Sequence, residues 1–411
     1  MMLLELRQLS QNFLKLKNSP YRRYFIQTCS FQHRLSFLLG SRGVGKTTTL
    51  VQYLLDHASQ DIYDPSILYV QVDHFQVSGI PLYEIAEQFY AMGGKLIAFD
   101  EIHKYSNWSQ ELKSIYDTFH KLKIIVSGSS ALQMHKGTHD LTRRAIKYQL
   151  LGLSFREFLE LHYALKLPSF SLADILRNHE RIAPSIMDSC EKLDQKILPL
   201  FQNYLDYGYY PYFLEIQNKE LYSLTLEQNL HTTIESDLAS IYPHLTGTSI
   251  HKIKQLLMYI AKAVPFTPKW NHLKESLEIG DIRTVKTYFK YLEEAYLIRS
   301  ISKKNTKLSH LDTPEKVYLD NPNQMHALSA GQPNKGTIRE TFFLNMLSAQ
   351  HQLTLPHQGD FLIDDKYLFE VGGRTKKFEQ IKEEKNAFLA CDDIETGLGA
   401  KIPLWLFGFL Y

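Results

Sequence analysis

Cysteine is scarce in this chain. Its 411 residues include three cysteines, which are far apart and odd in number: Cys29, Cys190 and Cys391. A disulfide framework needs paired cysteines and a metal cluster needs closely spaced ones, so the sequence excludes both as the basis of the fold. This usage is typical of a protein in a reducing cytoplasm, where we expect it.

Long apolar runs and an excess of one charge are also absent. No segment approaches the roughly 18 to 20 uninterrupted apolar residues that a membrane-spanning helix needs, so we expect no membrane partner. Residues 1–16 mix charged residues with leucines, which predicts an amphipathic helix packed on the first domain rather than a signal peptide. With 46 basic and 44 acidic residues the net charge is +2, so binding to nucleic acid requires a local basic patch.

The remaining composition is that of a folded protein. Hydrophobic residues make up 44% of the chain and charged residues 22%, close to the globular average. The length is sufficient for roughly two to four domains, each with its own core.

The most informative segment is a glycine-rich turn between the apolar residues 35–39 and a helix-like stretch. It has the full Walker A pattern, and its candidate nucleotide-binding residues are Gly40, Ser41, Arg42, Gly43, Val44, Gly45, Lys46, Thr47 and Thr48. Glycines let backbone N–H groups surround a triphosphate, and the helix N-terminus adds partial positive charge. Lys46 would contact the terminal phosphates and the Thr47 hydroxyl would coordinate Mg²⁺, so ATP and Mg²⁺ are the predicted cofactors.

Two carboxylates end a second apolar segment, Leu-Ile-Ala-Phe-Asp-Glu. Asp100 would hold Mg²⁺ through its water shell, and Glu101 would orient and deprotonate the attacking water. A protein that only bound nucleotide would not need Glu101, so the pair indicates hydrolysis.

A third apolar segment, residues 123–126, ends in Ser-Gly-Ser. The hydroxyl of Ser129 could sense the γ-phosphate, and ordinary turn chemistry is the alternative. Together with residues 67–73, these segments alternate with helix-length intervals, which predicts an α/β fold with a parallel sheet covered by helices on both faces. In such a sheet, ligands bind at the carboxyl ends of the strands.

Five motifs together resemble a known family. They are Gly-Ser-Arg-Gly-Val-Gly-Lys-Thr at 40–47, Phe-Asp-Glu-Ile-His at 99–103, Ser-Gly-Ser-Ser at 127–130, Leu-Ser-Phe-Arg-Glu-Phe at 153–158 and Tyr-Gly-Tyr-Tyr-Pro at 207–211. The chain resembles prokaryotic AAA-type P-loop ATPases that carry a winged helix and a C-terminal restriction-endonuclease-like domain of unknown function. The resemblance implies that Arg144 is a finger or sensor arginine acting on a nucleotide, and that the protein forms a homo-oligomer. A surface ion pair is the alternative for Arg144.

The middle of the chain has helix-like spacing, interrupted at Pro184 and Pro211, and we expect a helical lid and connector there. The aromatic run at 204–213 could stack bases but is more typical of a core.

Residues from about 250 have the rhythm of a winged helix-turn-helix, with helices over 253–261, 273–277 and 283–291 and a basic wing strand from residue 297. The third helix and the wing present basic side chains, so the candidate DNA-binding residues are Arg283, Lys286, Lys290, Lys303 and Lys304. Winged helices also bind proteins, so DNA and a protein partner both stay open.

The last hundred residues resemble a restriction-endonuclease-like core, and the resemblance implies a degenerate nuclease site of Glu340, Asp360, Glu370 and Lys376. In the active form of that fold, a lysine two residues after the glutamate supports the attacking water. Here that position is Gly372, and only Arg374, Lys376 or Lys377 could take over the role. We therefore expect an inactive domain, with a merely solvated strand end as the alternative to any metal site.

The sequence thus predicts four domains: an AAA-type P-loop ATPase domain over residues 1–165, a helical lid or connector over 166–248, a winged helix-turn-helix over 249–310, and a small α/β restriction-endonuclease-like domain over 311–411. The predicted function is Mg²⁺-dependent ATP hydrolysis coupled to DNA binding or remodelling. The alternatives are a nucleotide-gated switch acting on a protein partner and an ATP-gated DNA nuclease.

Overall fold

The chain folds into two compact units. Unit 1 contains Met1–Leu151, Thr232–Ile250 and Glu294–Tyr296, and unit 2 contains Gly152–His231, His251–Glu293 and Leu297–Tyr411. The structure is a computed structural model that describes residues 2–29, 31–129, 141, 143–303, 314–329, 333–377 and 384–411. The four-domain division remains a prediction.

The core of unit 1 is a five-stranded sheet in which every strand runs parallel to its neighbours. In spatial order the strands are β2 (Ile67–Gln71), β3 (Leu96–Asp100), β4 (Lys123–Ser129), β1 (Leu35–Gly40) and β5 (Ala145–Gln149). The continuous apolar runs of β1 and β3 are buried along their whole length, as strands covered on both faces must be. The predicted parallel sheet is confirmed, and its register puts Gly40 beside Ser129.

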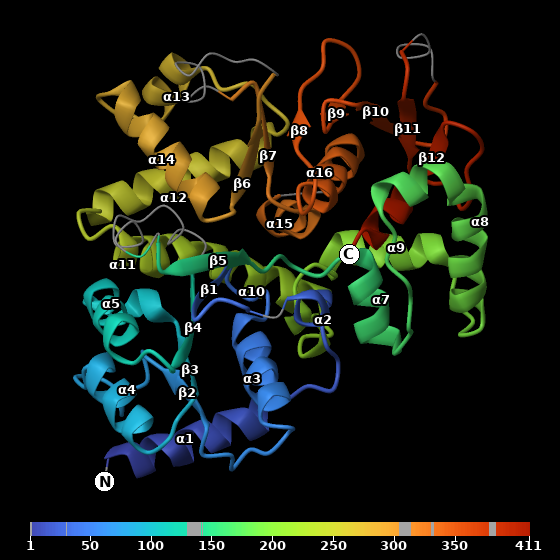
Figure 1. Cartoon of the computed structure of the whole chain (residues 1–411). Coiled ribbons are helices and arrows are strands. Elements are labelled where there is room, and N and C mark those ends of the chain that lie inside the picture. The colour runs from blue at the N-terminus through green and yellow to red at the C-terminus, as the bar shows by residue number, and fades with distance from the viewer. Residues whose placement is uncertain are drawn as a thin grey trace. The chain divides into compact units, whose positions relative to one another are not determined.

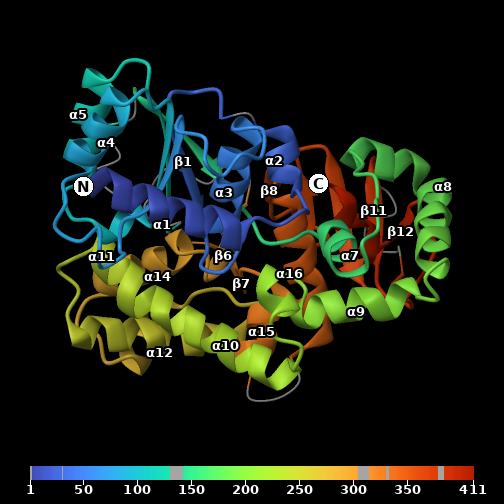
Figure 2. The ribbon, with the colours of Figure 1, turned by 90° about the horizontal axis from the view of Figure 1, so that it is seen from below.

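Helices cover both faces of this sheet. Helix α3 (Lys46–His57) packs on one face, and α4 (Leu82–Ala91) with α5 (Trp108–Thr118) lies on the other (Figures 1 and 2). The N-terminal helix α1 (Met2–Lys17) buries Leu3, Leu6 and Leu14, so the predicted amphipathic helix is confirmed. A short helix, α2 (Tyr24–Thr28), precedes β1.

A late segment of the chain completes unit 1. The π-helix η4 (Thr233–Leu238) continues directly from α10 (Lys219–Thr232) and runs into α11 (Ala239–Ile241). Helix α11 packs on the short 3-10 helix η1 (Ile102–Lys104), which follows β3. π-helices are rare overall, and those that occur are often found at functional sites. The position of η4 near the end of β3 therefore indicates a candidate functional region.

Unit 2 begins with α7 (Phe155–Tyr163), α8 (Leu172–Glu191), α9 (Ile197–Tyr207) and the 3-10 helix η3 (Pro211–Leu214). Ser154 and Glu157 form a capping box that starts α7, and Arg156 is buried in an ion pair with Glu160 at 2.7 Å. The Leu-Ser-Phe-Arg-Glu-Phe motif therefore has a structural role here. The expected break at Pro184 is wrong, because α8 continues through it and keeps a buried apolar face.

The aromatic run at 204–213 belongs to the core of unit 2. Tyr204, Tyr209, Tyr210 and Phe213 are each at most 3% exposed, and the backbone N–H of Tyr209 donates to Asn323 Oδ1 at 2.8 Å. Such burial leaves these four rings no face for a base, so their interpretation as core is confirmed, whereas Tyr207 and Tyr212 are only partly buried.

Three helices and a two-stranded antiparallel sheet follow: α12 (Gly247–Ala263), α13 (Trp270–Ser276), α14 (Ile282–Glu294), β6 (Ile298–Ile301) and β7 (Lys316–Leu319). Helix α14 buries Val285, Phe289 and Leu292, as its spacing predicts, whereas Tyr288 is only partly buried. The predicted helices are therefore present in the predicted order.

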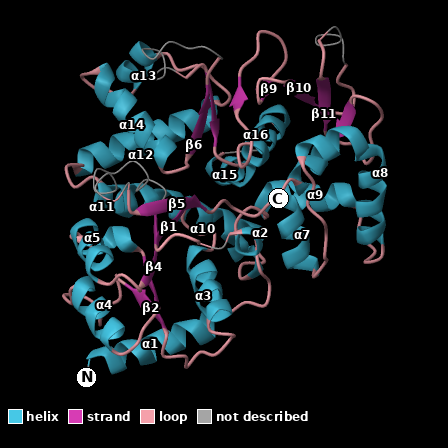
Figure 3. Ribbon diagram, in the orientation of Figure 1, coloured by secondary structure: helices cyan, strands magenta, loops and turns pink. Residues whose placement is uncertain are grey.

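The C-terminal part of unit 2 is built on a second five-stranded sheet. Strands β10 (Tyr367–Gly372), β11 (Ala387–Cys391) and β12 (Lys401–Pro403) are parallel, while β9 (Phe361–Ile363) and β8 (Leu353–Thr354) add antiparallel strands at one side. Helix α16 (Lys335–Leu347) packs against β10, next to α15 (Pro322–Leu328) and the 3-10 helix η6 (Leu404–Phe409) (Figure 3).

Candidate functional site

The glycine-rich loop connects β1 to α3, as predicted. Gly43 has a φ of 84° and Gly45 a φ of 97°, in the left-handed region that favours glycine. Lys46 begins α3 and its Nζ donates to the backbone oxygens of Gly40 at 3.0 Å and Ser41 at 3.1 Å. Lys46 is 7% exposed and lies at a helix N-terminus, an arrangement that attracts an anion. All candidate nucleotide-binding residues, 40–48, belong to this loop and the first turn of α3.

Asp100 ends β3 and accepts hydrogen bonds on both carboxylate oxygens. Thr47 Oγ1 and Tyr69 OH each donate to Oδ2 at 2.6 Å, and Ser127 Oγ donates to Oδ1. Burial and the neighbouring Asp100 charge raise the pKa of Tyr69, which keeps this hydroxyl a donor. A threonine hydroxyl and a carboxylate are the hard oxygen ligands that Mg²⁺ prefers, so Thr47 and Asp100 fit the predicted metal site.

Glu101 leaves β3 in a left-handed conformation with a φ of 58°, which few non-glycine residues adopt. Its backbone N–H donates to Ser127 Oγ at 3.1 Å and to Asp100 Oδ1 at 3.2 Å, and these bonds hold the turn. Its side chain is 25% exposed. A strained backbone position that presents a partly exposed carboxylate beside a metal site is typical of functional residues.

Ser129, at the end of β4, meets Glu101 through a third residue. The backbone N–H of Ser129 donates to His103 Nδ1 at 3.4 Å, and His103 Nε2 lies 3.5 Å from Glu101 Oε2. The structure thus brings the predicted base and the predicted sensor segment together around His103. The sequence contains His103 within a motif, but no spacing rule assigns it a role.

Asp237, on η4, is the centre of a charged cluster that sequence reasoning missed. Its Oδ1 lies 3.0 Å from Lys104 Nζ, 3.4 Å from the Arg42 guanidinium and 3.5 Å from His103 Nε2. Burial would raise the pKa of Asp237, but the nearby His103 and Lys104 outweigh burial and hold it at about 2. Tertiary packing alone brings Asp237 close to Arg42 of the glycine-rich loop, so no local sequence pattern could have predicted this cluster.

Arg144 forms a two-pronged ion pair with Asp117. Its Nε lies 2.9 Å from one carboxylate oxygen and its terminal nitrogen 3.0 Å from the other. Both side chains are partly exposed, 29% and 46%, so the surface-pair alternative describes this arginine here. Its action on a nucleotide stays a prediction.

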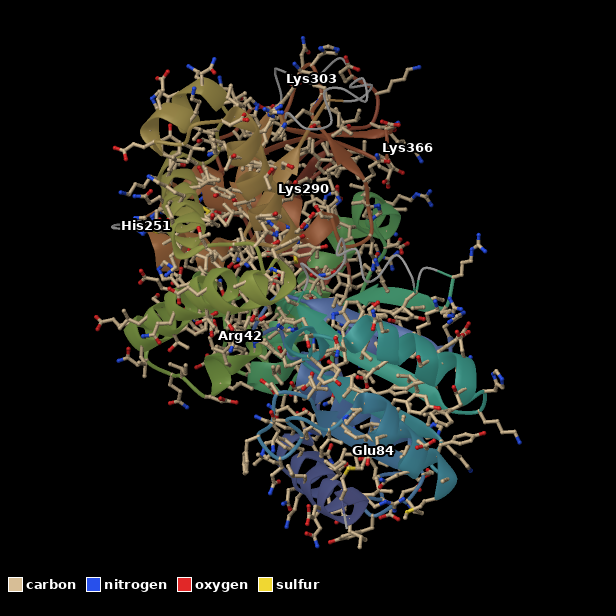
Figure 4. All side chains as sticks on the ribbon, turned by 90° about the vertical axis from the view of Figure 1, so that its left-hand side faces the viewer. Arg42, Glu84, His251, Lys290, Lys303 and Lys366 are labelled. Atoms are coloured by element: carbon tan, nitrogen blue, oxygen red, sulfur yellow. The ribbon has the colours of Figure 1, made fainter. Side chains whose placement is uncertain are left out.

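The candidate DNA-binding residues of α14 lie in unit 2. Arg283 is 90% exposed and pairs with Asp281 at 2.9 Å, and Lys286 Nζ lies 5.4 Å from the centroid of the Trp270 ring. Lys290 is exposed (Figure 4). Since a carboxylate already accompanies Arg283, this face carries less free positive charge than the sequence alone suggests.

Of the two candidates in the wing, Lys303 pairs with Glu315 at 2.8 Å. Lys304 lies outside the described residues.

Lys376 fills the space beside Gly372. Its Nζ lies 2.6 Å from Glu370 Oε1, and a Cβ on Gly372 would stand 2.7 Å from its Cγ. The Lys376 stem therefore crosses the point where a lysine at position 372 would begin. The hydrogen bond to Glu370 raises the pKa of Lys376.

The other two nuclease candidates have separate partners. Asp360 accepts from the Val371 N–H at 2.8 Å, and burial raises its pKa, while Glu340 accepts from Lys316 at 2.7 Å and Tyr318 OH at 2.6 Å. Within the described part of the chain, no group of three or more His, Cys, Asp or Glu side chains could hold a metal ion.

The parallel sheet with β4 between β1 and β3, the glycine-rich loop and the Thr47–Asp100 pair define unit 1 as a P-loop nucleotide-binding domain. Residues 32–159 match the family model described as an AAA domain, so this segment is similar to P-loop domains of the AAA type. Residues 198–334 match a second family model, a domain of unknown function named DUF8612.

One curated relative is an uncharacterized protein of Methanocaldococcus jannaschii, MJ1637, which is 27% identical over 90% of this chain and 81% of the relative. Among solved structures, the Aeropyrum pernix ORC1 protein in complex with DNA is 12% identical, with 80% of this chain and 91% of that chain covered and a TM-score of 0.32. AMPPCP-bound DnaA from Aquifex aeolicus is 15% identical, with 71% and 88% covered and a TM-score of 0.28. Scores this low carry no argument about function.

None of the helices in the described ranges is both long enough and apolar enough to cross a membrane.

Proposed function

We propose that this protein is a Mg²⁺-dependent ATPase that works as a homo-oligomer and couples ATP turnover to DNA binding or remodelling. In this proposal Lys46 binds the terminal phosphates, Thr47 and Asp100 hold Mg²⁺, and Glu101 activates the attacking water. Ser129 and Arg144 respond to the γ-phosphate. Bound Mg²⁺ would neutralise charge that develops on the phosphates.

The single observation that carries this proposal is the contact between Thr47 Oγ1 and Asp100 Oδ2 at 2.6 Å, with Glu101 as the next residue. A metal-binding pair beside a separate, partly exposed carboxylate is what hydrolysis requires and what mere nucleotide storage does not.

The test is steady-state ATP hydrolysis by the full chain with Mg²⁺, alone and with duplex or single-stranded DNA. We expect turnover that requires Glu101 and that DNA stimulates. Slow turnover that neither DNA changes would instead favour a nucleotide-gated switch acting on a protein partner, and absent turnover would contradict the ATPase itself.

DNA coupling is supported by the order of three helices and a two-stranded antiparallel sheet from α12 to β7, which is typical of a winged helix, and by exposed Arg283 and Lys290. Replacing Arg283, Lys286 and Lys290 together by alanine should weaken DNA binding and flatten its salt dependence. Unchanged affinity and salt slope in that variant would rule out α14 as the contact.

We further predict that the C-terminal sheet cleaves no DNA, because its carboxylates are held by Lys376, Lys316 and backbone rather than gathered around a metal. Mg²⁺-dependent cleavage of plasmid DNA that Glu370→Ala abolishes would contradict this.

A further inference from the structure

We infer that His103 is a positioning residue for Glu101, and that Asp237 holds His103 in this role. The inference rests on the proposed ATPase function and adds to it two residues that no motif assigns. Both belong to unit 1, at the end of β3 and on the π-helix η4.

The hydrogen bonding of His103 fixes which nitrogen carries its proton. Nδ1 accepts from the backbone N–H of Ser129 at 3.4 Å, so the proton of the neutral ring belongs on Nε2. That nitrogen lies 3.5 Å from Glu101 Oε2 and 3.5 Å from Asp237 Oδ1. The Nε2–H is therefore directed between two carboxylates, one of which is the predicted base.

Burial separates this arrangement from an ordinary core histidine. The His103 side chain is 1% exposed, and a buried polar atom normally has a well-formed hydrogen bond. Its Nε2 makes none in this structure and stands at long distance from both carboxylates. A short movement of the Glu101 side chain would complete the bond, so the donor is in place for a working position of Glu101.

Asp237 is itself rigidly held. Its side chain is 5% exposed, with Lys104 Nζ at 3.0 Å and the Arg42 guanidinium at 3.4 Å, and Lys104 also donates to Ser236 Oγ at 2.6 Å. Paired in this way, Asp237 provides a fixed negative charge beside the imidazole. A carboxylate next to a histidine stabilises one orientation and one tautomer of the ring.

Glu101 needs such support because its carboxylate ends a flexible side chain that is 25% exposed. A base that samples several rotamers spends little time in line with the attacking water, and misplacement by about 1 Å can slow a reaction about 100-fold. The series of contacts from Asp237 through His103 to Glu101 would restrict the Glu101 side chain to one rotamer. It would also tie the base to Ser129, whose N–H contacts the same ring.

The test compares His103→Ala, His103→Gln, Asp237→Asn and the double variant His103→Ala with Asp237→Asn. Asp56→Asn is the matched control, because Asp56 pairs with Arg22 at 2.8 Å in the same unit at the far end of α3. For each full-length protein we would measure kcat and KM for ATP, the Kd of a fluorescent ATP analogue, and the urea concentration at which half of the protein is unfolded (the urea midpoint).

We expect His103→Ala to lower kcat by about 10- to 100-fold while KM and the analogue Kd change less than about threefold. His103→Gln should recover part of the loss, because its amide N–H can donate to Glu101. Asp237→Asn should lower kcat by less than His103→Ala, and the double variant should be no slower than His103→Ala, since both act through one contact.

Several results would overturn the inference while leaving the ATPase intact: wild-type kcat in His103→Ala, additive losses in the double variant, or a fall in kcat that follows a collapse of the urea midpoint and of nucleotide binding. If the wild-type protein does not hydrolyse ATP, or if its hydrolysis does not depend on Lys46, both the proposed function and this inference are wrong. The analogue Kd tells these cases apart, because it reads binding without turnover.

Discussion

Units 1 and 2 each place a lysine a few residues after the end of a strand, and the two ammonium groups have different partners. In unit 1, Lys46 donates to the backbone oxygens of Gly40 and Ser41, while Asp100 is held by neutral hydroxyls. In unit 2, Lys376 Nζ bonds directly to Glu370 at 2.6 Å.

This difference separates a site that can receive an anion from one that has neutralised itself. A phosphate can replace two backbone oxygens as partners of Lys46 without breaking an ion pair, whereas a ligand of Lys376 must first displace a buried carboxylate. Similar residue types in a similar order therefore do not have the same chemical capacity.

Lys46→Ala tests the first half of the comparison and should have the largest effect. Removing the phosphate cation should lower ATP turnover by on the order of 10³-fold, because positive charge at the transferring phosphate is the main electrostatic stabilisation there. Hydrolysis is measured beside Lys121→Ala, an exposed lysine of the same unit that should behave as wild type. Full activity in Lys46→Ala would refute the site.

Glu101→Gln separates binding from chemistry within the same site. The substitution keeps the shape but removes the base, so turnover should fall at least about 100-fold while the fluorescent ATP analogue still binds. Normal hydrolysis would mean that Glu101 is only a strand-end carboxylate.

Most of unit 1 could be predicted from the sequence because its signals are local. The apolar runs predicted four of the five parallel strands, and the loop from Gly40 to Thr47 carries its own glycine requirement and its own helix start. Strand β5 was not predicted, because its residues are partly exposed and do not form an apolar run. Asp237 could not be predicted, since its partners Arg42 and Lys104 meet it only through tertiary packing of η4. For the same reason no pattern showed that Asp117 pairs with Arg144.

Lys376→Met sharpens the second half of the comparison. It leaves Glu370, which is 1% exposed, without its cation, so the free energy of unfolding should fall by about 2 kcal/mol, discounted from a fully buried pair because Lys376 is partly exposed. ATP turnover should not change. The control is Lys366→Met, since Lys366 Nζ lies 4.7 Å from the centroid of the Tyr367 ring. An equal loss of stability in both variants would contradict a special Lys376–Glu370 pair.

Asp237→Asn tests a buried aspartate whose charge stabilises unit 1. Its pKa of about 2 lies below the ordinary 3.8, which corresponds to about 2 kcal/mol of stability at pH 7. A depressed pKa contributes stability above 3.8 and loses it as pH falls toward 2. Urea unfolding should therefore show a constant deficit in the variant from pH 7 to pH 5 that shrinks only below 3.8.

Asp360→Asn should have the smallest effect, and the opposite sign. Burial raises the pKa of Asp360 above 3.8, so ionisation of this carboxyl opposes folding as the pH rises above 3.8, and the loss of stability is complete once the pH exceeds the folded-state pKa. Asparagine keeps an oxygen acceptor for the Val371 N–H and removes the charge, so the free energy of unfolding at pH 7 should rise, and the gain should vanish as pH falls below 3.8. Asp360→Ala, which also loses the acceptor, should gain less. A loss of stability in Asp360→Asn would mean that the cations near Asp360 stabilise its charge, and that the C-terminal cluster resembles the Asp237 cluster of unit 1 after all.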